Sequence, residues 1–443
     1  CDILSFGEGQ MKELIRQKII DSLAVSIPPM TRRDIRLPGI SGKATAVIGM
    51  RRTGKTTFLW QVIGDRLKQG MAREGLLYFN FEDERLAGLE AANLHWVVEE
   101  YYRLHPEWRD RKRAVFFFDE IQMVQAWESF VRRLLDTENA EIFISGSSAK
   151  LLSREVATSM RGRAMETIVH PFSFREYLRH RSREPKDPPG RWTKAVRSAM
   201  EKELERYLLE GGFPEAQDAD ARDRTDLLRN YVDTALFRDV VERRAVTHVA
   251  ALRWMVRQLL GNAGGSFSVN KFYRDIRSQG LAVSKDTLHD YLGYLEDAFL
   301  IRTVFLHSRS ERRRMVNPRK VYPVDPGLIP IFDRTGETGL GHALETCVMI
   351  ELERRGGEIA YAKTPAGFEV DFVARLHDGR EELIQVSADL GDPEVRNREI
   401  RALMDAKSLH PRASLNIITL HREARGEMPE NIRVHGAADW LLS

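Results

Sequence analysis

Residues 44–63 read ATAVIGMRRTGKTTFLWQVI, and the fold is decided by this stretch. The apolar run 44–48 predicts a buried strand, and the segment 49–56 that follows it fits the pattern G-x-x-x-x-G-K-[ST]. Apolar residues then recur at helical spacing between Leu59 and Leu67. Strand, glycine loop and helix in this order are the context in which the pattern forms a phosphate-binding loop. The alternative is a chance match in an ordinary loop.

The residue types in this loop suit a nucleotide. Gly49 and Gly54 let backbone N–H groups close around phosphate oxygens, and the start of the helix adds partial positive charge. Lys55 places a positive charge beside the terminal phosphates, and the hydroxyl of Thr56 is a ligand for Mg²⁺. We therefore expect ATP and Mg²⁺ as cofactors. The predicted nucleotide-binding residues are Gly49, Arg52, Thr53, Gly54, Lys55, Thr56 and Thr57.

A second strand ends in two carboxylates. Residues 114–120 read AVFFFDE and resemble a Walker B strand, although a buried strand with a polar end has the same pattern. In the Walker role, Asp119 holds Mg²⁺ through water, and Glu120 orients and polarises the attacking water. Together with the glycine loop, the strand predicts an α/β domain of the P-loop type that hydrolyses ATP.

Two more strands carry polar residues that suit the same site. Residues 76–81 read LLYFNF, and Asn80 stands where AAA+ proteins often place a polar residue that restrains the catalytic glutamate. Residues 141–148 read EIFISGSS, so Ser145 or Ser147 can bond the γ-phosphate or the attacking water, as in a sensor-1 strand. A helix cap or a turn residue explains each of these three side chains equally well.

Arg161 and Arg163 follow the sensor strand. Either arginine can reach the nucleotide of a neighbouring subunit as an arginine finger, which would require a homo-oligomer, with a ring as one form. The alternative is a pair of arginines that are simply solvated at the surface.

Composition sets broad limits on the rest of the chain. The 443 residues include 68 Lys and Arg against 65 Asp and Glu, a net charge of +3, so basic surface can come only from local clustering. Cys1 and Cys347 are the two cysteines, which excludes a disulfide framework and a cysteine-based zinc site. Because no apolar run approaches the roughly 18–20 residues that span a bilayer, we expect no membrane segment and a cytoplasmic protein.

The middle of the chain predicts a helical lid packed on the ATPase core (171–245), followed by a winged helix (246–335). Residues 302–320 hold seven basic residues against Glu311 alone, a net charge of +6, where the wing would lie and meet phosphates. The predicted recognition helix after Ser284 carries acidic residues, which disfavours sequence-specific readout. A winged helix that contacts only protein is the alternative. The predicted DNA-binding residues are Lys271, Arg274, Arg277, Lys285, Arg309, Arg312, Arg313, Arg314, Arg319 and Lys320.

The order of elements predicted in the last third resembles that of the PD-(D/E)xK nuclease fold. A helix with Glu345, a strand with Asp371 and a strand with Gln385 match the positions of its metal ligands. The lysine that should follow at position 387 is Ser387, which cannot supply a cation, and Lys363 is the speculative substitute. We therefore expect a degenerate module that keeps the fold for DNA or subunit contact.

These residues together resemble a known family: the bacterial and archaeal AAA+-like ATPases with a C-terminal domain of the DUF4143 type. The segments that carry the resemblance are GMRRTGKTT, FFFDEIQ, ISGSSAKLL, RGR, PFSFREYL, GGFP, RDV, KVYPVDPGL, GHALE, EVDF and IQVS. The resemblance implies ATP, Mg²⁺, a multisubunit assembly and, for some members, action on DNA. The predicted parts are 1–10 (a tag or extension), 11–170 (ATPase core), 171–245 (lid), 246–335 (winged helix) and 336–443 (nuclease-like module).

Three functions remain open from the sequence. The first is an ATP-driven motor or remodeller of duplex or branched DNA, supported by the P-loop, the Walker B strand and the basic wing. The second is an ATP-controlled switch or defence regulator that gates a partner protein, supported by the acidic recognition helix. The third is an ATP-powered, metal-dependent nuclease, and Ser387 argues against it.

Overall fold

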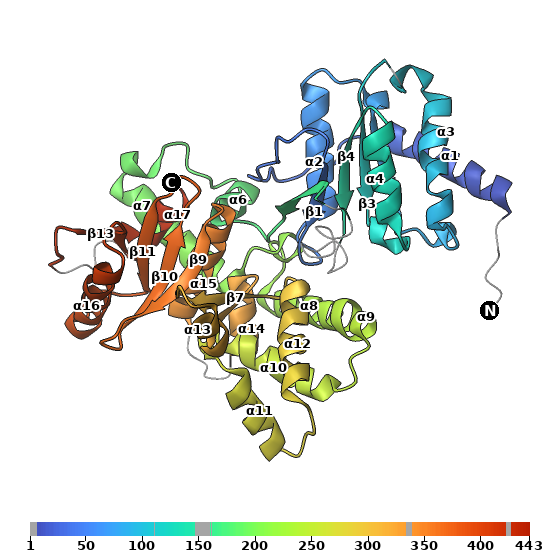
Figure 1. Cartoon of the computed structure of the whole chain (residues 1–443). Coiled ribbons are helices and arrows are strands. Elements are labelled where there is room, and N and C mark those ends of the chain that lie inside the picture. The colour runs from blue at the N-terminus through green and yellow to red at the C-terminus, as the bar shows by residue number, and fades with distance from the viewer. Residues whose placement is uncertain (1–6, 110, 147–159, 161, 334–338, 422–426) are drawn as a thin grey trace. The chain divides into compact units, whose positions relative to one another are not determined.

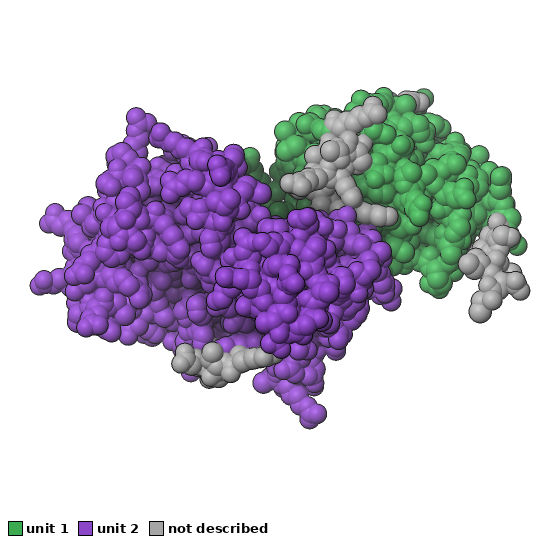
Figure 2. All heavy atoms as spheres, turned by 60° about the horizontal axis from the view of Figure 1, so that its bottom comes forward, with its two compact units in different colours: residues 1–170 green, residues 171–443 purple. Residues whose placement is uncertain are grey.

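The computed structural model describes residues 7–109, 111–146, 160, 162–333, 339–421 and 427–443 (Figure 1). The chain divides into two compact units, residues 1–170 and 171–443, which Figure 2 shows in different colours. The break falls where the sequence predicts the end of the ATPase core. Among the described residues, no helix has the length and apolar character that crossing a membrane requires.

The first unit is built on a parallel sheet of five strands in the order β2-β3-β4-β1-β5. Its strands are β1 (Ala44–Ile48), β2 (Leu76–Asn80), β3 (Ala114–Asp119), β4 (Ala140–Ser145) and β5 (Ala164–Ile168). Its helices are α1 (Glu8–Ala24), α2 (Lys55–Lys68), α3 (His95–Leu104) and α4 (Trp127–Thr137). In a parallel sheet all carboxyl ends lie at one edge, so the segments that follow these strands meet there.

The phenylalanines of β3 show how the sheet is covered on both faces. Phe117 stacks on Phe143 of β4, with ring centroids 4.9 Å apart, on the face where the side chains of α2 pack. Phe116, which points the other way, packs edge-on against Tyr101 of α3 at 5.4 Å. Phe118 approaches Phe130 of α4 at 5.8 Å. Each such buried ring stabilises the fold by about 1.5–3 kcal/mol, which is why the sequence of β3 is almost wholly apolar.

The second unit contains a mixed sheet of eight strands in the order β13-β12-β11-β10-β9-β7-β8-β6. Its strands are β6 (Ser266–Phe267), β7 (Ile301–Leu306), β8 (Arg319–Pro323), β9 (Glu358–Lys363), β10 (Glu369–Arg375), β11 (Glu381–Ser387), β12 (Ser414–Thr419) and β13 (Ile432–Gly436). Strand β7 pairs in parallel with β9, with Leu306 opposite Tyr361. The predicted winged helix and the predicted nuclease-like module therefore share one sheet, and the boundary predicted at residues 335 and 336 does not separate two domains.

The helices predicted as a lid belong to this second unit. They are α6 (Phe174–His180), α7 (Lys194–Glu210), α8 (Ala221–Thr234) with the π-helical segment Ala235–Val241, and α9 (Glu242–Arg244). Tyr177 of α6 and Leu204 of α7 lie in one apolar core with Tyr322 of β8 and Val348 of the C-terminal half. Helices α6 and α7, which the sequence predicts as part of the lid, thus bury apolar residues in the core of the second unit.

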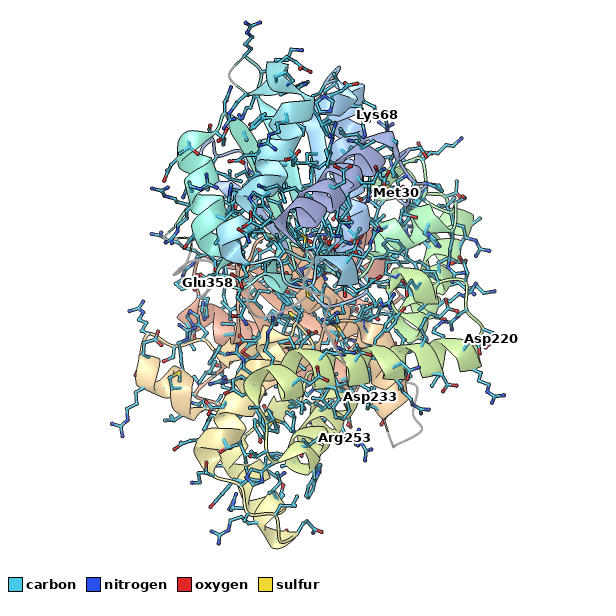
Figure 3. The ribbon with its side chains drawn as sticks, turned by 90° about the vertical axis from the view of Figure 1, so that its right-hand side faces the viewer. Met30, Lys68, Asp220, Asp233, Arg253 and Glu358 are labelled. Carbon is cyan, nitrogen blue, oxygen red and sulfur yellow. The ribbon has the colours of Figure 1, made fainter. Side chains whose placement is uncertain are left out.

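The remaining helices complete the second unit. They are α10 (Val249–Gly261), α11 (Val269–Ser278), α12 (Lys285–Asp297), α13 (Glu311–Val316), α14 (Ile329–Phe332), α15 (Leu340–Arg354), α16 (Pro393–Leu409) and α17 (Ala437–Leu441). Figure 3 labels Asp220 and Asp233, which mark the two ends of α8, and Arg253 on α10. The guanidinium group of Arg253 lies over the ring of Phe237, 4.8 Å from its centroid. This cation–π contact ties α10 to the segment that continues α8.

Helices α10 to α12 and strands β6 to β8 lie in the segment that the sequence predicts as a winged helix, and α12 begins after Ser284, where the recognition helix is predicted. Ser284 caps α12 as expected, because its hydroxyl accepts a hydrogen bond from the backbone N–H of Thr287 at 3.0 Å. Strands β7 and β8 form an antiparallel hairpin, and β6 pairs with β8. The short helix α13 stands between β7 and β8, at the position predicted for the wing.

Candidate functional site

The glycine loop has the backbone shape that the sequence predicts. Gly49 has a φ of 147°, and a Cβ atom there would lie 2.3 Å from the carbonyl oxygen of Val169. Gly54 has a φ of 93° and stands just before the first turn of α2. Only glycine adopts both conformations without strain, so the two glycines of the motif are a requirement of the loop itself.

Hydrogen bonds within the loop hold it in place. The hydroxyl of Thr53, which is buried, donates to the carbonyl oxygen of Met50 at 3.0 Å. The Nζ atom of Lys55 donates to the carbonyl oxygens of Gly49 and Met50, at 3.1 and 2.9 Å. Its side chain therefore curls back over the loop, on the side where phosphate oxygens would be held. Thr56 and Thr57 are exposed at the start of α2, and Arg52 is exposed with a φ of 68°.

Arg33 braces this loop, and the sequence pattern does not reveal it. The residue is 4% exposed, and its Nη1 atom donates to the carbonyl oxygen of Thr53 at 2.8 Å. Its backbone N–H also donates to the side chain of Gln61 on α2 at 2.7 Å. Arg33 lies outside the motif in the sequence, so no local signal could have identified it.

The Walker B carboxylate is the centre of a hydroxyl cluster. Asp119 is buried at the end of β3 and accepts hydrogen bonds from Thr56 at 2.8 Å, from Tyr78 at 2.7 Å and from Ser145. The predicted metal residues Thr56 and Asp119 are thus in direct contact. Their donor set is a hydroxyl and a carboxylate, the oxygen ligands that Mg²⁺ prefers, so these residues fit the ion. Burial and the charge of Asp119 raise the pKa of Tyr78, which keeps its hydroxyl protonated as a donor.

Glu120 occupies a strained position beside this cluster. Its φ is 52°, a left-handed conformation that is uncommon for a residue other than glycine. Its backbone N–H donates to the hydroxyl of Ser145 at 3.3 Å, and its carboxylate accepts a hydrogen bond from the side-chain amide of Gln122. Ser145 therefore links Asp119 to Glu120, and Gln122 orients the carboxylate. The role of Gln122 could not be read from the sequence.

The contacts of the other predicted residues of the nucleotide site do not establish the roles predicted for them. Asn80 lies opposite Asp119 in the register of the sheet, and its side chain accepts a hydrogen bond from the backbone N–H of Glu82 at 2.7 Å. Arg163 is exposed and forms an ion pair with Asp136 of α4. The roles predicted for Asn80 and Arg163 remain predictions. Ser147 and Arg161 lie outside the described residues.

Most of the predicted DNA-binding residues are exposed, two are partly buried, and Lys320 is buried. On α11, Lys271, Arg274 and Arg277 are exposed, and Arg277 and Lys285 both lie over the ring of Tyr273, at 5.7 and 5.4 Å from its centroid. At the wing, the exposed arginines are Arg309, Arg312 and Arg313. The two further arginines of the wing, Arg314 and Arg319, are partly buried and pack on Phe305.

Lys320 is the exception, and its predicted contact with DNA is wrong. Its side chain is 4% exposed, and its Nζ atom lies 2.8 Å from Asp371, 3.0 Å from Glu345 and 3.0 Å from Glu369. Burial lowers the pKa of Lys320, but the three carboxylates outweigh burial and raise the pKa above its ordinary value. Lys320 is therefore a charged group enclosed by carboxylates. The run of basic residues in the sequence predicts an exposed position for it, and that prediction is wrong.

The structure does bring the nuclease-like residues together. The carboxylate of Asp371 accepts the backbone N–H of Val386 at 3.0 Å, and the backbone N–H of Asp371 donates to Gln385 at 3.2 Å. Glu345 also accepts a hydrogen bond from the hydroxyl of Tyr322 at 2.8 Å. Burial, and then the charge of Asp371, raise the pKa of Glu345.

The same cluster does not fit a divalent metal ion. The ammonium group of Lys320 lies between Glu345 and Asp371, at hydrogen-bond distance from both, and a second cation there would be repelled. Lys363, the substitute considered from the sequence, is 45% exposed and pairs with Glu369 at 3.2 Å, as the outer member of the cluster. We therefore derive no cleavage step from these residues.

Comparisons with known proteins match both halves of the chain. Residues 41–178 match a family model described as an AAA domain, and residues 201–337 match a domain of unknown function, DUF8612. The domain model that matches after the AAA domain is therefore DUF8612, where the resemblance in the sequence implied the DUF4143 type.

Curated relatives span nearly the whole chain. The uncharacterized protein MJ1544 of Methanocaldococcus jannaschii is 33% identical over 419 residues, which cover 93% of this chain and 90% of the relative. An uncharacterized protein of Haemophilus influenzae is 30% identical over 399 residues, which cover 89% of this chain and 93% of the relative.

Solved structures are similar at lower identity. The Walker-type ATPase PABY2304 of Pyrococcus abyssi is 17% identical with a TM-score of 0.40, over 72% of this chain and 95% of that chain. The ORC2 protein of Aeropyrum pernix, in its complexes with ADPNP and ADP, is 12% identical with a TM-score of 0.35, over 74% of this chain and 93% of that chain.

Proposed function

The chain belongs to a family of AAA+-like P-loop ATPases in which a domain of unknown function follows the AAA domain, and from this premise we propose that it hydrolyses ATP to drive an oligomeric motor or remodeller that acts on DNA. The observation that carries the ATPase proposal is the cluster of Thr56, Asp119, Ser145 and Glu120 beside the glycine loop. It supplies oxygen ligands and a carboxylate base at one edge of the sheet. We place this activity in the cytoplasm, in line with the expectation from the sequence.

The residues divide the work of hydrolysis among them. The N–H groups of the glycine loop and the Lys55 ammonium group hold the phosphates, and Lys55 exchanges its bonds to the carbonyls of Gly49 and Met50 for phosphate oxygens. Bound Mg²⁺ would be held by Thr56 and Asp119 and would neutralise phosphate charge. Glu120, oriented by Gln122, accepts the proton of the attacking water. An arginine of a neighbouring copy, Arg161 or Arg163, would complete the site.

The exposed basic groups support the part of the proposal that concerns DNA. Arg309, Arg312 and Arg313 at the wing and Lys271, Arg274 and Arg277 on α11 present charges suited to phosphates. Tyr273, between Arg277 and Lys285, adds an aromatic ring to the second group. Acidic residues on α12 repel phosphate and so disfavour entry of this helix into a groove, so we propose binding through the DNA backbone by the other groups, without a preferred sequence.

We expect DNA to stimulate the ATPase, and the wing to mediate the effect. Duplex and four-way branched DNA should raise the wild-type rate several-fold. Replacing both Arg312 and Arg313 with alanine should weaken DNA binding. A plot of the logarithm of the binding constant against the logarithm of the salt concentration should become less steep by about 2, because each lost side chain removes about one phosphate contact that releases a counterion. Fluorescence anisotropy over a salt series measures the slope.

The matched control carries Arg401→Ala and Arg412→Ala, which remove two exposed arginines from the C-terminal part of the second unit. This control should bind DNA like the wild type. An ATPase rate that no DNA changes, together with normal hydrolysis, would reject the DNA proposal and leave the ATPase proposal standing.

The alternative function is a nucleotide-controlled switch that gates a partner protein. It is favoured by the acidic residues of α12, among them Asp286 and Asp290, which are exposed. A switch would hydrolyse ATP slowly and would show no translocation. Directional movement along DNA would exclude it.

We expect no nuclease activity. Plasmid and branched DNA should stay intact when incubated with the protein and Mg²⁺ or Mn²⁺, because the ammonium group of Lys320 lies between the carboxylates of Glu345 and Asp371, where a metal ion would bind. Gel electrophoresis of the DNA after incubation checks this. If the unmodified protein cleaves DNA and Asp371→Asn does not, the cluster binds a metal ion.

A further inference from the structure

Three side chains that commonly bind metal ions converge in the second unit, and none of them belongs to the clusters around Asp119 and Asp371. They are His307, Glu381 and His410, and one ligand atom from each lies within 4.8 Å of the other two. His307 directly follows β7, Glu381 begins β11, and His410 directly follows α16. Residues from three separate elements thus meet at one point, and no local sequence pattern predicts it.

The backbone fixes each of the three residues. The N–H of His307 donates to the carbonyl oxygen of Tyr361 on β9 at 2.6 Å. The N–H of His410 donates to the carbonyl oxygen of Ala406, as the C-cap of α16, at 3.1 Å. Glu381 is paired with Arg375 in the ladder between β10 and β11. Because sheet and helix hold the backbone, little conformational entropy would be lost when the side chains close on an ion.

The side chains form the start of a ligand sphere. The ring of His410 is 5% exposed, and its Nδ1 atom lies 2.8 Å from the carboxylate of Glu381. The ring of His307 lies beside it, with centroids 4.6 Å apart and a tilt of 58°. Two imidazoles and one carboxylate are the ligand set of many sites for zinc-like ions.

A cavity adjoins this cluster. It has a volume of about 260 Å³, and His307 and Glu381 contribute to its lining together with Arg309, Arg314 and Arg375. Three protein ligands leave one position of a tetrahedral ion open toward such a cavity. Glu358 also lines the cavity, but the three arginines outnumber it, so the open position suits an anionic ligand such as hydroxide or phosphate.

We propose that His307, Glu381 and His410 bind a divalent transition-metal ion of the zinc class. Neighbouring ligand atoms of a tetrahedral zinc site lie about 3.4 Å apart, and those of the three residues lie within 4.8 Å of one another, so the side chains would have to move closer together to bind the ion. The competing explanation is a hydrogen-bonded pair of His410 and Glu381 with His307 packed beside it.

Metal analysis of the full-length protein distinguishes the two explanations. The protein is treated with a chelator, dialysed against zinc chloride in excess Mg²⁺, dialysed again without zinc, and measured by plasma mass spectrometry. Mg²⁺ occupies sites built from oxygen ligands, so that zinc retained after dialysis reports sites with nitrogen ligands. We expect one zinc ion per chain in the wild type. Titration calorimetry should show at least tenfold weaker binding for His307→Ala and Glu381→Gln.

The variants are chosen so that the fold survives. The side chain of His307 is exposed, and Gln at position 381 keeps an acceptor for the Nδ1 atom of His410. His289→Ala removes an exposed histidine of α12 and is the matched control, with unchanged zinc binding. Cobalt substitution is the second measurement, because tetrahedral Co²⁺ absorbs visible light and His307→Ala should abolish that absorption. No retained zinc in the wild type, or equal binding by wild type and His307→Ala, overturns the proposal.

Discussion

Replacing Glu120 with glutamine is expected to leave ATP binding intact and to lower the rate of hydrolysis by about 10²–10⁴-fold, the usual contribution of a general base. Glutamine has nearly the shape of glutamate and can still bond to Gln122, but it cannot accept a proton from water. Lys55, which we propose holds the phosphates, and Thr56, which would hold Mg²⁺, are untouched by the change. Phosphate release under saturating ATP measures turnover, and calorimetric titration with Mg²⁺-ATP measures binding.

Two further variants make the result specific. Glu84→Gln removes the charge of an exposed glutamate in the same unit and should leave both binding and turnover unchanged. Asp119→Asn should weaken binding of Mg²⁺-ATP as well as turnover, because Asp119 holds the hydroxyls of Thr56, Tyr78 and Ser145. If Glu120→Gln hydrolyses ATP at the wild-type rate, the assignment of Glu120 as the base is wrong.

Replacing Lys320 with methionine should destabilise the second unit by about 3–5 kcal/mol, the usual cost of removing one partner from a buried ion pair. Methionine preserves most of the aliphatic volume but leaves Glu345, Glu369 and Asp371 without their shared cation. Differential scanning calorimetry should show the transition of this unit falling by on the order of 10 °C. Lys363→Met is the matched control, because this half-exposed lysine pairs with Glu369 alone, and its loss should change stability by less than about 1 kcal/mol.

The pH dependence of the Lys320→Met variant provides a second check. Burial and Asp371 already raise the pKa of Glu345, and without the lysine the pKa rises further in the folded state. A carboxyl group whose pKa is higher in the folded than in the unfolded state binds more protons when folded, so stability falls as pH rises between the two values. The difference in the free energy of unfolding between the wild type and Lys320→Met should therefore be smaller at pH 5 than at pH 8. If this difference is the same at pH 5 and at pH 8, Lys320 does not stabilise the charged form of Glu345.

Much of the first unit could be predicted from the sequence, because its signals are local. The strand before Gly49, the helix after Gly54 and the strand that ends at Asp119 are all present where the pattern predicts them. The contact between Thr56 and Asp119 also follows from local pattern, since parallel strands bring their carboxyl ends to one edge. The bracing by Arg33 could not be predicted, because the residue lies outside the motifs of the sequence. Gln122 ends the motif FFFDEIQ, but the motif does not show that its side chain bonds to Glu120.

The second unit was harder to predict, because its organisation depends on pairing between distant segments. The parallel pairing of Phe305 with Ala360 joins two predicted domains into one sheet, and nothing in either segment indicates the partner. The helices predicted as a lid have apolar faces that the sequence displays, but the sequence does not say which surface covers them. Lys320 illustrates the same limit, since its neighbours in the chain are basic and its neighbours in space are acidic.

The sequence alone determined the class of this protein, an α/β P-loop ATPase of the AAA+ type, because binding phosphate needs particular residues at fixed spacing along the chain. It also determined the order of helix and strands that carries Glu345, Asp371 and Gln385. Tertiary structure alone decided what those acids face and where His307, Glu381 and His410 meet. The physical reason is that charge pairing and metal ligation depend on distances in space, and these distances are set by sheet register and by helix packing between segments far apart in the chain.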